Sequence, residues 1–332
     1  MGAGWGRIFS SGNTISTKQR HHLFLAGTAA GVAAGFNAPI TGVFFAIECG
    51  NRYLSKNTIK LDEDAPDGPR ADIAAIVLAA ALADIFVRLG LNESGALSIQ
   101  GNTYAMSSPF FELPIYMGLG LVSGGIAVVF TRLRDVFTEL FNGESWGKNL
   151  PIANLPRYFH PLFGGLFCGI IAVFFPQTLF VGYTTLDQLI GGKIQLAFPL
   201  LIQLLSLKLV LSSFALGSGL VGGVFAPSLF FGAAAGTAYH DIVASVIGLF
   251  HDTLPGAIDV PSLDAFFTIA NAPAYATVGA AATLGALFRA PLTSSMLMFE
   301  LTQNHDIVLP VLVSTGLGGL FAELLTQSRR LW

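Results

Sequence analysis

The sequence GTAAGVAAGFNAPITGVFFAIE (27–48) aligns without gaps against GAAATLGALFRAPLTSSMLMFE (279–300), at a constant offset of 252 residues. Two apolar segments can resemble each other by chance, but a shared F-x-A-P-x-T followed by Glu seven residues later is a specific pattern. The identities include Gly27/Gly279, Phe36/Phe288, Ala38/Ala290, Pro39/Pro291, Thr41/Thr293 and Glu48/Glu300. The chain therefore contains an internal repeat, which is common in membrane transporters and is often inverted across the membrane plane.

Each copy of the repeat is predicted to form a helix, a sharp break and a short second helix. Small residues before the break allow close helix packing in a membrane. In the first copy we expect Asn37 to cap the short helix, with Pro39 in its first turn. Glu48 and Glu300 end the short helices. Intramembrane acids are functional candidates, but the symmetry of this pair favours a structural role such as a hydrogen bond to neighbouring backbone.

The composition predicts an all-α, polytopic membrane protein with broken, re-entrant helices. Hydrophobic residues make up 53% of the 332 residues and charged residues 11%, against roughly 25% charged in soluble domains. Apolar runs long enough to cross a bilayer lie at 71–92, 112–131, 159–175, 196–216 and 306–325. Shorter apolar pieces broken by Gly and Pro lie at 23–48, 224–250 and 274–300, and polar connectors at 51–70, 135–157 and 251–270. We expect eight to eleven helical segments.

Several classes of function find no support in the sequence. The net charge of −3 does not indicate nucleic acid as a partner, and the two cysteines form no disulfide framework. The six histidines show no metal-ligand spacing, and no cofactor or metal site is predicted. An intramembrane enzyme would need a nucleophile motif of the G-x-S-x-G type or H-E-x-x-H, and neither is present. We therefore expect a protein that is not an enzyme.

The glycine-rich stretch GSGLVGGVFAPSLFFGAAAG (217–236) is the candidate binding element. Its glycines permit a backbone that leaves helix geometry, and Pro227 is expected near the first turn of a new helix. The amides at such a helix start, with the positive end of the helix dipole, favour an anion. The candidate amide donors are those of Val224, Phe225 and Ala226. The alternative is that this stretch only packs against other helices.

Two further residues near this element are pathway or structural candidates. Ser218 lies within the glycine-rich stretch. Lys208 lies in the middle of an apolar run, where it either adds a positive field to an anion path or extends toward an interface. A transporter of cations or neutral solutes would be expected to show more intramembrane carboxylates than Glu48 and Glu300.

These motifs together resemble the CLC family of chloride channels and chloride/proton exchangers. Gly223-Val224-Phe225-Ala226-Pro227 looks like the family's G-x-F-x-P element, and the two repeat copies look like its symmetry-related helix pairs. The segments GYTTLDQLIGGK (182–193) and FELTQNHDIVLP (299–310) are also similar, most of all to the branch in plants and photosynthetic microbes. The resemblance implies chloride binding at Gly223–Pro227 and a homodimer whose face corresponds to 38–48, 71–92, 291–302 and 306–325.

The resemblance also shows three departures. Two chloride-binding loops of the family's first half, G-S-G-x-P and G-K/R-E-G-P, do not occur before position 27. The repeat offset places a counterpart of 217–227 before Met1, so the first repeat (1–135) is expected to be incomplete and the second (158–332) complete. Cys49 stands where exchangers carry a second glutamate, and no tyrosine follows the last long helix. Residues 1–332 form a single transmembrane domain in this interpretation, without a cytosolic regulatory domain.

The function predicted from these observations is that of a voltage-gated-type chloride channel, which passes chloride or other small anions passively across a lipid bilayer. The alternatives are a chloride/proton antiporter and a non-conducting, N-terminally truncated subunit that dimerises with full-length subunits. The predicted location is a membrane, and an organellar membrane such as that of the plastid or Golgi is compatible with the sequence.

Overall fold

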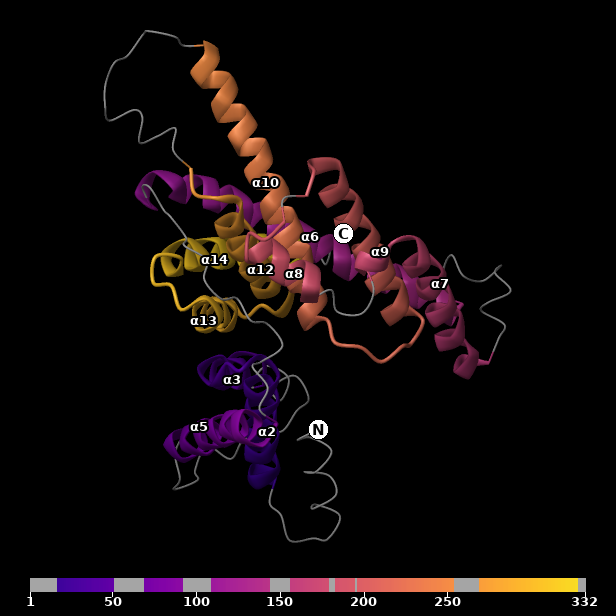
Figure 1. Ribbon diagram of the computed structural model, residues 1–332. Coiled ribbons are helices and arrows are strands. Elements are labelled where there is room, and N and C mark those ends of the chain that lie inside the picture. Colours follow the sequence, from indigo (N-terminus) through magenta and orange to yellow (C-terminus); the bar gives the residue numbers. More distant parts are fainter. Residues whose placement is uncertain are drawn as a thin grey trace. The chain divides into compact units, whose positions relative to one another are not determined.

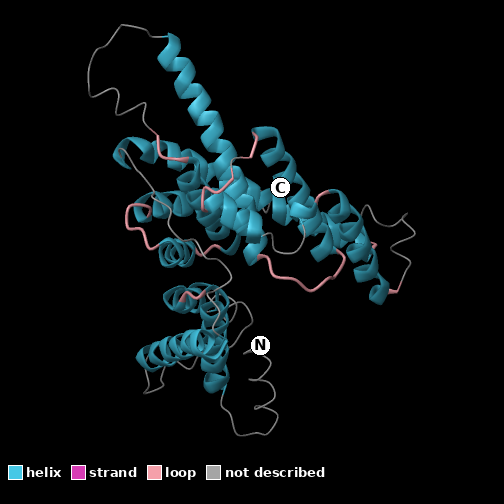
Figure 2. Cartoon of the chain, viewed as in Figure 1, coloured by secondary structure: helices cyan, strands magenta, loops and turns pink. Residues whose placement is uncertain are grey.

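The computed structural model describes residues 17–50, 69–91, 109–143, 156–178, 183–194, 196–253 and 269–327. These residues form eleven α-helices and no strand, in agreement with the expected number of helical segments (Figure 2). The helices are α2 (Thr17–Phe36), α3 (Pro39–Phe45), α5 (Pro69–Phe86), α6 (Pro109–Asn142), α7 (His160–Phe174), α8 (Tyr183–Ile190), α9 (Phe198–Gly217), α10 (Phe225–Thr253), α12 (Ala272–Phe288), α13 (Pro291–Thr302) and α14 (Val308–Gln327) (Figure 1). Single π-helical turns follow α3 and α5, at Ala46–Gly50 and Val87–Leu91.

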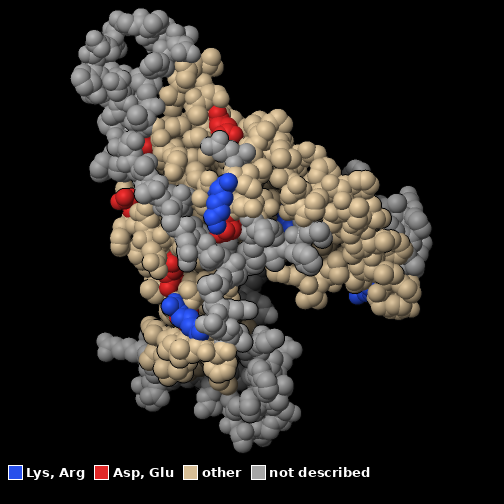
Figure 3. All heavy atoms as spheres, viewed as in Figure 1, with Lys and Arg blue, Asp and Glu red and all other residues tan. Residues whose placement is uncertain are grey.

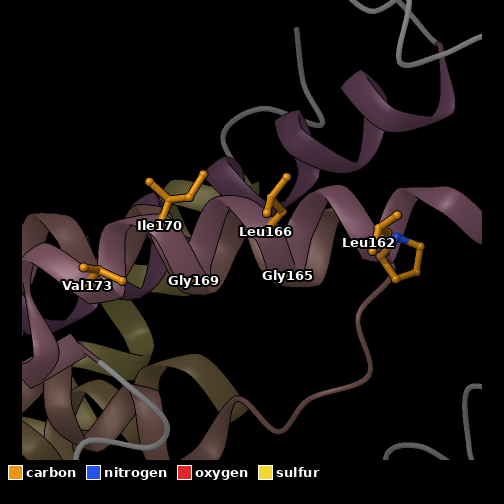
Figure 4. A pocket seen from close by; sticks show the side chains of 7 residues that line it. Leu162, Gly165, Leu166, Gly169, Ile170 and Val173 are labelled. Carbon is orange, nitrogen blue, oxygen red and sulfur yellow. The ribbon is translucent and has the colours of Figure 1, made fainter.

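Among the described residues, six helices are long and apolar enough to cross a membrane, by length and composition. They include all five predicted spans, and the sixth lies within α10. Their surfaces suit lipid: side chains such as Leu166, Ile170 and Val173 project outward from α7 beside Gly165 and Gly169, where they line a shallow apolar groove (Figure 4). Charged residues are sparse and scattered on the face drawn in Figure 3.

The chain divides into two compact units, which are described separately. The first contains 1–100 and 288–305, and the second contains 101–287 and 306–332. In the first unit, α2, α3 and α5 pack around a core of small and aliphatic residues. A β-carbon on Gly42 of α3 would lie 2.4 Å from the carbonyl oxygen of Ala29 on α2. Glycine is therefore needed where these two helices cross.

In the second unit, α14 runs alongside α6 at backbone contact distance. A β-carbon on Gly120 or Gly124 of α6 would lie 2.6 Å from the carbonyl oxygen of Ser314 or Gly318 of α14, respectively. The Ser314 hydroxyl also donates a hydrogen bond to the Tyr116 carbonyl, at 2.6 Å. Small residues and buried serine hydroxyls thus hold these helices together. This is usual in membrane bundles, because in lipid there is no hydrophobic driving force for helices to associate.

The predicted breaks in both repeat copies are confirmed. Asn37 and Arg289, which are equivalent at the offset of 252, have φ angles of 55° and 54° and lie between the two helices of their copies. The next residues are also alike: Ala38 has φ −136° and ψ 77°, and Ala290 has φ −127° and ψ 71°. The repeat in the sequence is therefore a repeat in backbone geometry.

Several sequence-based expectations were wrong in detail. Segment 224–250 is not broken: α10 is continuous over Phe225–Thr253, with Pro227 in its first turn and with Gly232 and Gly236 at the contact with α12. Connector 135–157 begins too early, since α6 continues to Asn142. Asn37 does not cap α3; Ala38 holds the N-cap position without a side-chain hydrogen bond, and Asn37 ends α2 in the left-handed conformation. Connector 51–70 lies almost entirely outside the described residues.

Candidate functional site

The glycine-rich stretch after α9 forms a tight helix end. Gly219 has φ +87°, and its amide bonds the Leu216 carbonyl at 3.1 Å, while the Leu220 amide bonds the Ala215 carbonyl at 3.2 Å. This pair of bonds is the Schellman motif, in which a left-handed glycine satisfies the last carbonyls of a helix. The Ser218 hydroxyl also donates a hydrogen bond to the Ala215 carbonyl, at 2.7 Å. Ser218 is thus used to end α9.

The residues that follow lead into the start of α10. Gly222 and Gly223 are exposed, and a β-carbon on Gly223 would meet no atom within 4 Å. Ser228 donates the first helical backbone bond, to the Val224 carbonyl at 3.1 Å. The Ser228 hydroxyl bonds the Phe225 carbonyl at 2.6 Å. The helix therefore begins where the sequence predicted, with an open backbone approach in front of it.

The electrostatics of this helix start are those of an anion-favouring end. The amides of Val224, Phe225 and Ala226 precede the first helical bond, and Pro227, which has no N–H, is the third residue of the helix. The first turn contains no acidic residue. A helix of this length carries about half a positive charge at its N-terminus, so that an anion there is stabilised and a cation is not.

Helix α10 is held in place by its contact with α12. A β-carbon on Gly232 would lie 2.1 Å from the Gly279 carbonyl oxygen, and one on Gly236 would lie 2.1 Å from the Tyr275 carbonyl oxygen. From the other side, a β-carbon on Gly279 would lie 2.3 Å from the Gly232 carbonyl oxygen. This crossing fixes the axis of α10 and hence the direction in which its N-terminal amides point.

Lys208 lies on α9 against the same helix. Its side chain is 3% exposed, and its Nζ is 5.7 Å from the centre of the Phe230 ring on α10. Burial does not fit the interpretation in which the ammonium group extends to an aqueous interface. A cation over an aromatic face is a favourable arrangement when both are shielded from water. Lys208 therefore lies buried at the α9–α10 contact.

Glu48 and Glu300 lie in the other unit and bind the repeat copies to each other. Glu48, at the end of the first copy, accepts bonds from the amides of Leu292 and Thr293 on α13, at 3.2 and 2.7 Å, and from the Thr293 hydroxyl at 2.6 Å. Glu300 accepts the equivalent three bonds from the first copy: those of the Ile40 amide at 2.9 Å, the Thr41 amide at 2.7 Å and the Thr41 hydroxyl.

Each carboxylate thus caps a helix that has no side-chain cap of its own. Neither Ala38 nor Ala290 offers a side-chain acceptor at its N-cap position. The negative charge also lies at the positive end of the helix dipole, which is the favourable orientation. These hydrogen bonds fit the structural role that the sequence favours for Glu48 and Glu300. The expected hydrogen bonds to backbone join one repeat copy to the other.

Comparison with known proteins gives the family. The family described as voltage gated chloride channel matches residues 1–323. The chain belongs to the voltage-gated chloride channel family. It is 36% identical over 305 residues to chloride channel protein CLC-f of Arabidopsis thaliana, covering 90% of this chain and 35% of that protein. It is 34% identical to CLC-e of the same plant, covering 93% of this chain and 40% of that protein.

Bacterial relatives and solved structures agree with this membership. The H(+)/Cl(−) exchange transporter ClcA of Cronobacter sakazakii is 27% identical, covering 98% of this chain and 61% of that protein. The fold matches a slow cyanobacterial Cl−/H+ antiporter with a TM-score of 0.66 at 23% identity, covering 98% of this chain and 66% of that one. A eukaryotic CLC transporter matches with a TM-score of 0.63 at 24% identity, covering 96% of this chain and 46% of that one. The chain thus spans about a third to two thirds of the length of these relatives.

As a member of this family, the chain is an integral, multi-pass membrane protein of all-α fold. Its site candidates fall in two places. Lys208 and Ser218 of α9 and Gly223–Pro227 at the start of α10 belong to the second unit, whereas Glu48 and Glu300 lie together in the first.

Sequence reasoning missed one buried acid, Glu112, at the start of α6. The signal was present in FELPIY (111–116), where an acid and a tyrosine four residues later occupy one face of a membrane helix.

Proposed function

We propose that this chain contributes to a chloride channel, in which chloride or another small anion crosses the bilayer passively past the amides at the start of α10. The observation that carries the proposal is the open backbone at Gly222 and Gly223, which leads to a long helix with no acid in its first turn. An anion there exchanges part of its hydration shell for fixed N–H donors, as selectivity filters do with other backbone dipoles.

The residues around the amides have separable roles in this mechanism. Pro227 fixes φ in the first turn and leaves the preceding amides as the donors. The α10–α12 crossing at Gly232 and Gly279 holds the axis along which those amides point. The Schellman turn at Gly219 keeps α9 out of the approach, and Lys208 adds positive charge that favours anions over cations.

The proposal is tested with the chain reconstituted in lipid vesicles, by measuring chloride efflux and the chloride-to-nitrate selectivity. We expect Pro227→Ala and Phe225→Ala to reduce flux or change selectivity, because both alter the first turn that presents the amides. The matched control is Pro199→Ala, which changes a proline in the first turn of α9, away from the glycine-rich approach. Unchanged flux and selectivity in both Pro227→Ala and Phe225→Ala would remove the assignment.

The same vesicles separate a channel from an exchanger. We favour channel behaviour because Cys49 follows Glu48, at the position of the second glutamate that exchangers carry. The Cys49 thiol lies 3.9 Å from the Phe288 carbonyl oxygen, and a neutral thiol is a poorer proton carrier than a carboxylate at neutral pH. Chloride efflux that drives no proton uptake supports the channel. Stoichiometric proton movement supports the antiporter, which is what several of the relatives are named.

We also propose that a second copy of the chain covers the apolar face of the first unit. Helix α5 leaves large side chains exposed along its length, at Ile73, Val77, Leu78, Leu82, Ile85, Phe86 and Leu89. This helix belongs to the segments where the family resemblance places the homodimer. Cysteine cross-linking at Leu78 is expected to give a covalent dimer, whereas cysteine at Ile170, on the lipid-exposed groove of α7, is the matched control. Failure of cross-linking at Leu78, with a monomer in mild detergent, would leave lipid as the occupant and a non-dimeric subunit.

A further inference from the structure

A group of polar side chains lies buried in the second unit, away from the start of α10. It forms where the beginning of α6 meets the middle of α10 and the start of α12. Glu112 is 2% exposed, and Tyr116 and Tyr275 are fully buried. The two tyrosine rings stack with their centres 4.7 Å apart and an angle of 28° between their planes. Three polar groups are therefore withdrawn from both water and lipid.

None of these groups is satisfied by a described side chain or backbone group. Both carboxylate oxygens of Glu112 and both hydroxyl groups of Tyr116 and Tyr275 lack a hydrogen-bond partner among the described residues. The Ala270 backbone and the Tyr116 hydroxyl are polar groups that face the Glu112 carboxyl group. Buried polar groups in native proteins are nearly always paired. An unpaired acid beside two unpaired hydroxyls therefore indicates a binding site for a small ligand or ion.

The surrounding charges do not neutralise Glu112. The ion pairs found among the described residues join other side chains, and none of them includes Glu112. Helix α10 contributes Tyr239, whose hydroxyl bonds the Ile115 carbonyl at 3.0 Å, and His240. The His240 ring lies edge-on to Tyr275, with centres 5.3 Å apart, and its Nδ1 is 3.3 Å from an Asp241 oxygen.

The remaining titratable groups on the packed elements are few. Helix α14, which runs along α6, has Asp306 just before its start and Glu323 near its end. Residues 269–271, which precede α12, contain none. The other basic residues on these described helices lie further along them: Arg132 and Arg134 are 20 residues or more beyond Glu112 on α6, and His251 is near the end of α10. His240 is the basic side chain that a ring contact places beside Tyr275, and its Nδ1 faces Asp241.

A buried carboxylate without a counter-charge is costly by several kcal/mol, and in practice it takes up a positive charge. A hard metal cation prefers six or more oxygen ligands, whereas the described residues offer one carboxyl group and two hydroxyls here. A proton needs only one of those oxygens. We propose that Glu112, Tyr116 and Tyr275 form a buried proton-binding site, in which Glu112 is held as a neutral carboxylic acid.

This assignment balances the donors and acceptors of the three side chains. The neutral acid has one O–H donor and one carbonyl acceptor, and a tyrosine hydroxyl pairs with either. The ionised acid offers acceptors to both hydroxyls but leaves its charge uncompensated. The inference does not rest on the proposed anion function, because none of its residues belongs to the α9–α10 contact.

The direct test is infrared spectroscopy of the whole chain in lipid, which detects the C=O stretch of a protonated carboxyl group. We expect this band at pH 7 in the unaltered protein and its loss in Glu112→Gln. The matched control is Glu139→Gln, which changes an exposed acid on the same helix and is expected to leave the band unchanged. An identical spectrum for Glu112→Gln and the unaltered protein at pH 7 would show that Glu112 is ionised, and would overturn the proposal.

A second measurement keeps the proposal testable if Glu112→Gln does not fold. In the unaltered protein, the band is expected to disappear when the pH is raised and to return when it is lowered. Tyr116→Phe and Tyr275→Phe are each expected to shift the frequency of the band, because each removes a polar hydroxyl from the buried group around the acid. If the band keeps its intensity at all pH values and its frequency in both variants, it does not belong to Glu112.

The remaining arm separates a proton from a monovalent metal cation. Thermal unfolding is compared in sodium buffer and in buffer whose only cation is a bulky organic amine. A ligand that binds only the folded state raises Tm with its concentration. The same Tm in both buffers is expected for a proton site. A Tm that rises with sodium in the unaltered protein and not in Glu112→Gln would assign the site to the metal cation instead.

Discussion

The two copies of the repeat have the same backbone and different surroundings. At the break, Asn37 and Arg289 share a left-handed conformation, and the alanines that follow differ by less than 10° in φ and ψ. Yet every residue of α12 from Ala274 to Ala286 is buried, whereas α2 leaves Gly31 and Gly35 exposed. Local sequence therefore determines the path of the chain in each copy, while the neighbouring helices determine what each helix contacts.

The difference has an identifiable cause. Helix α12 is crossed by α10 at glycines, so closely that a β-carbon would enter the backbone of the other helix. On α2, by contrast, a β-carbon on Gly31 or Gly35 would meet nothing within 4 Å. Glycine is thus required at the crossing of α12 with α10 and dispensable at Gly31 and Gly35 of α2, and substitutions can measure this.

The largest effect is expected for Gly279→Ala. The added β-carbon would lie 2.3 Å from the Gly232 carbonyl oxygen, and backbone cannot yield as a flexible side chain does. Overpacking of this kind costs about 3 kcal/mol. Denaturant unfolding in detergent micelles measures the loss. If Gly279→Ala is as stable as the unaltered protein, the close crossing of α10 and α12 is not present in solution.

The next effect tests the carboxylates that join the copies. Glu48→Ala leaves two amides and one hydroxyl on α13 without an acceptor, and Glu300→Ala does the same on α3. Each substitution is expected to cost about 2 kcal/mol. Because both act on the same pair of helices, the double variant should cost less than the sum of the singles. Strict additivity would mean that the two caps are independent.

A smaller effect is expected from the threonine hydroxyls alone. Thr41→Val and Thr293→Val keep the shape of the side chain and both backbone bonds, but remove one donor to Glu300 or Glu48. A loss of about 1 kcal/mol is expected in each case. Equal losses in the same unfolding assay would confirm that the copies are energetically alike at this contact; a cost in only one would show that the symmetry is geometric only.

The last effect has the opposite sign. Gly31→Ala on α2 adds a methyl group into open space and removes a flexible residue from a helix interior. A gain of about 1 kcal/mol is expected from helix propensity. Destabilisation by Gly31→Ala in the assembled protein in lipid would show that another helix covers this face of α2. The surroundings of α2 would then resemble those of α12 more closely than the exposure of Gly31 in a single chain indicates.

Much of this could be predicted from sequence because the decisive signals are local. The break at Asn37 and Ala38, the start of α10 near Pro227 and five of the six candidate spans follow from apolar length, proline position and the repeat itself. The glutamates were expected to bond backbone, since their symmetric placement favoured a structural role.

The errors and omissions come from interactions between distant segments. The glycines Gly232 and Gly236 of α10 lie at the contact with α12. From sequence alone, glycines in an apolar segment were interpreted as a break in the helix. The N-cap of α3 was assigned to Asn37 because the real acceptor, Glu300, lies more than 250 residues away. Glu112 was missed because its significance depends on Tyr275 and His240, which other helices bring to it.

The exchange of caps between Glu48 and Glu300 has one more consequence. Each copy carries both the carboxylate that one contact needs and the helix start that the other needs, so the contact is self-complementary. Two-fold symmetric dimers are built in this way, because the same surface patch of each subunit binds its copy on the other subunit. A contact that would ordinarily depend on protein concentration is here made within a single polypeptide, where its strength is set by the length and folding of the chain that joins the two halves.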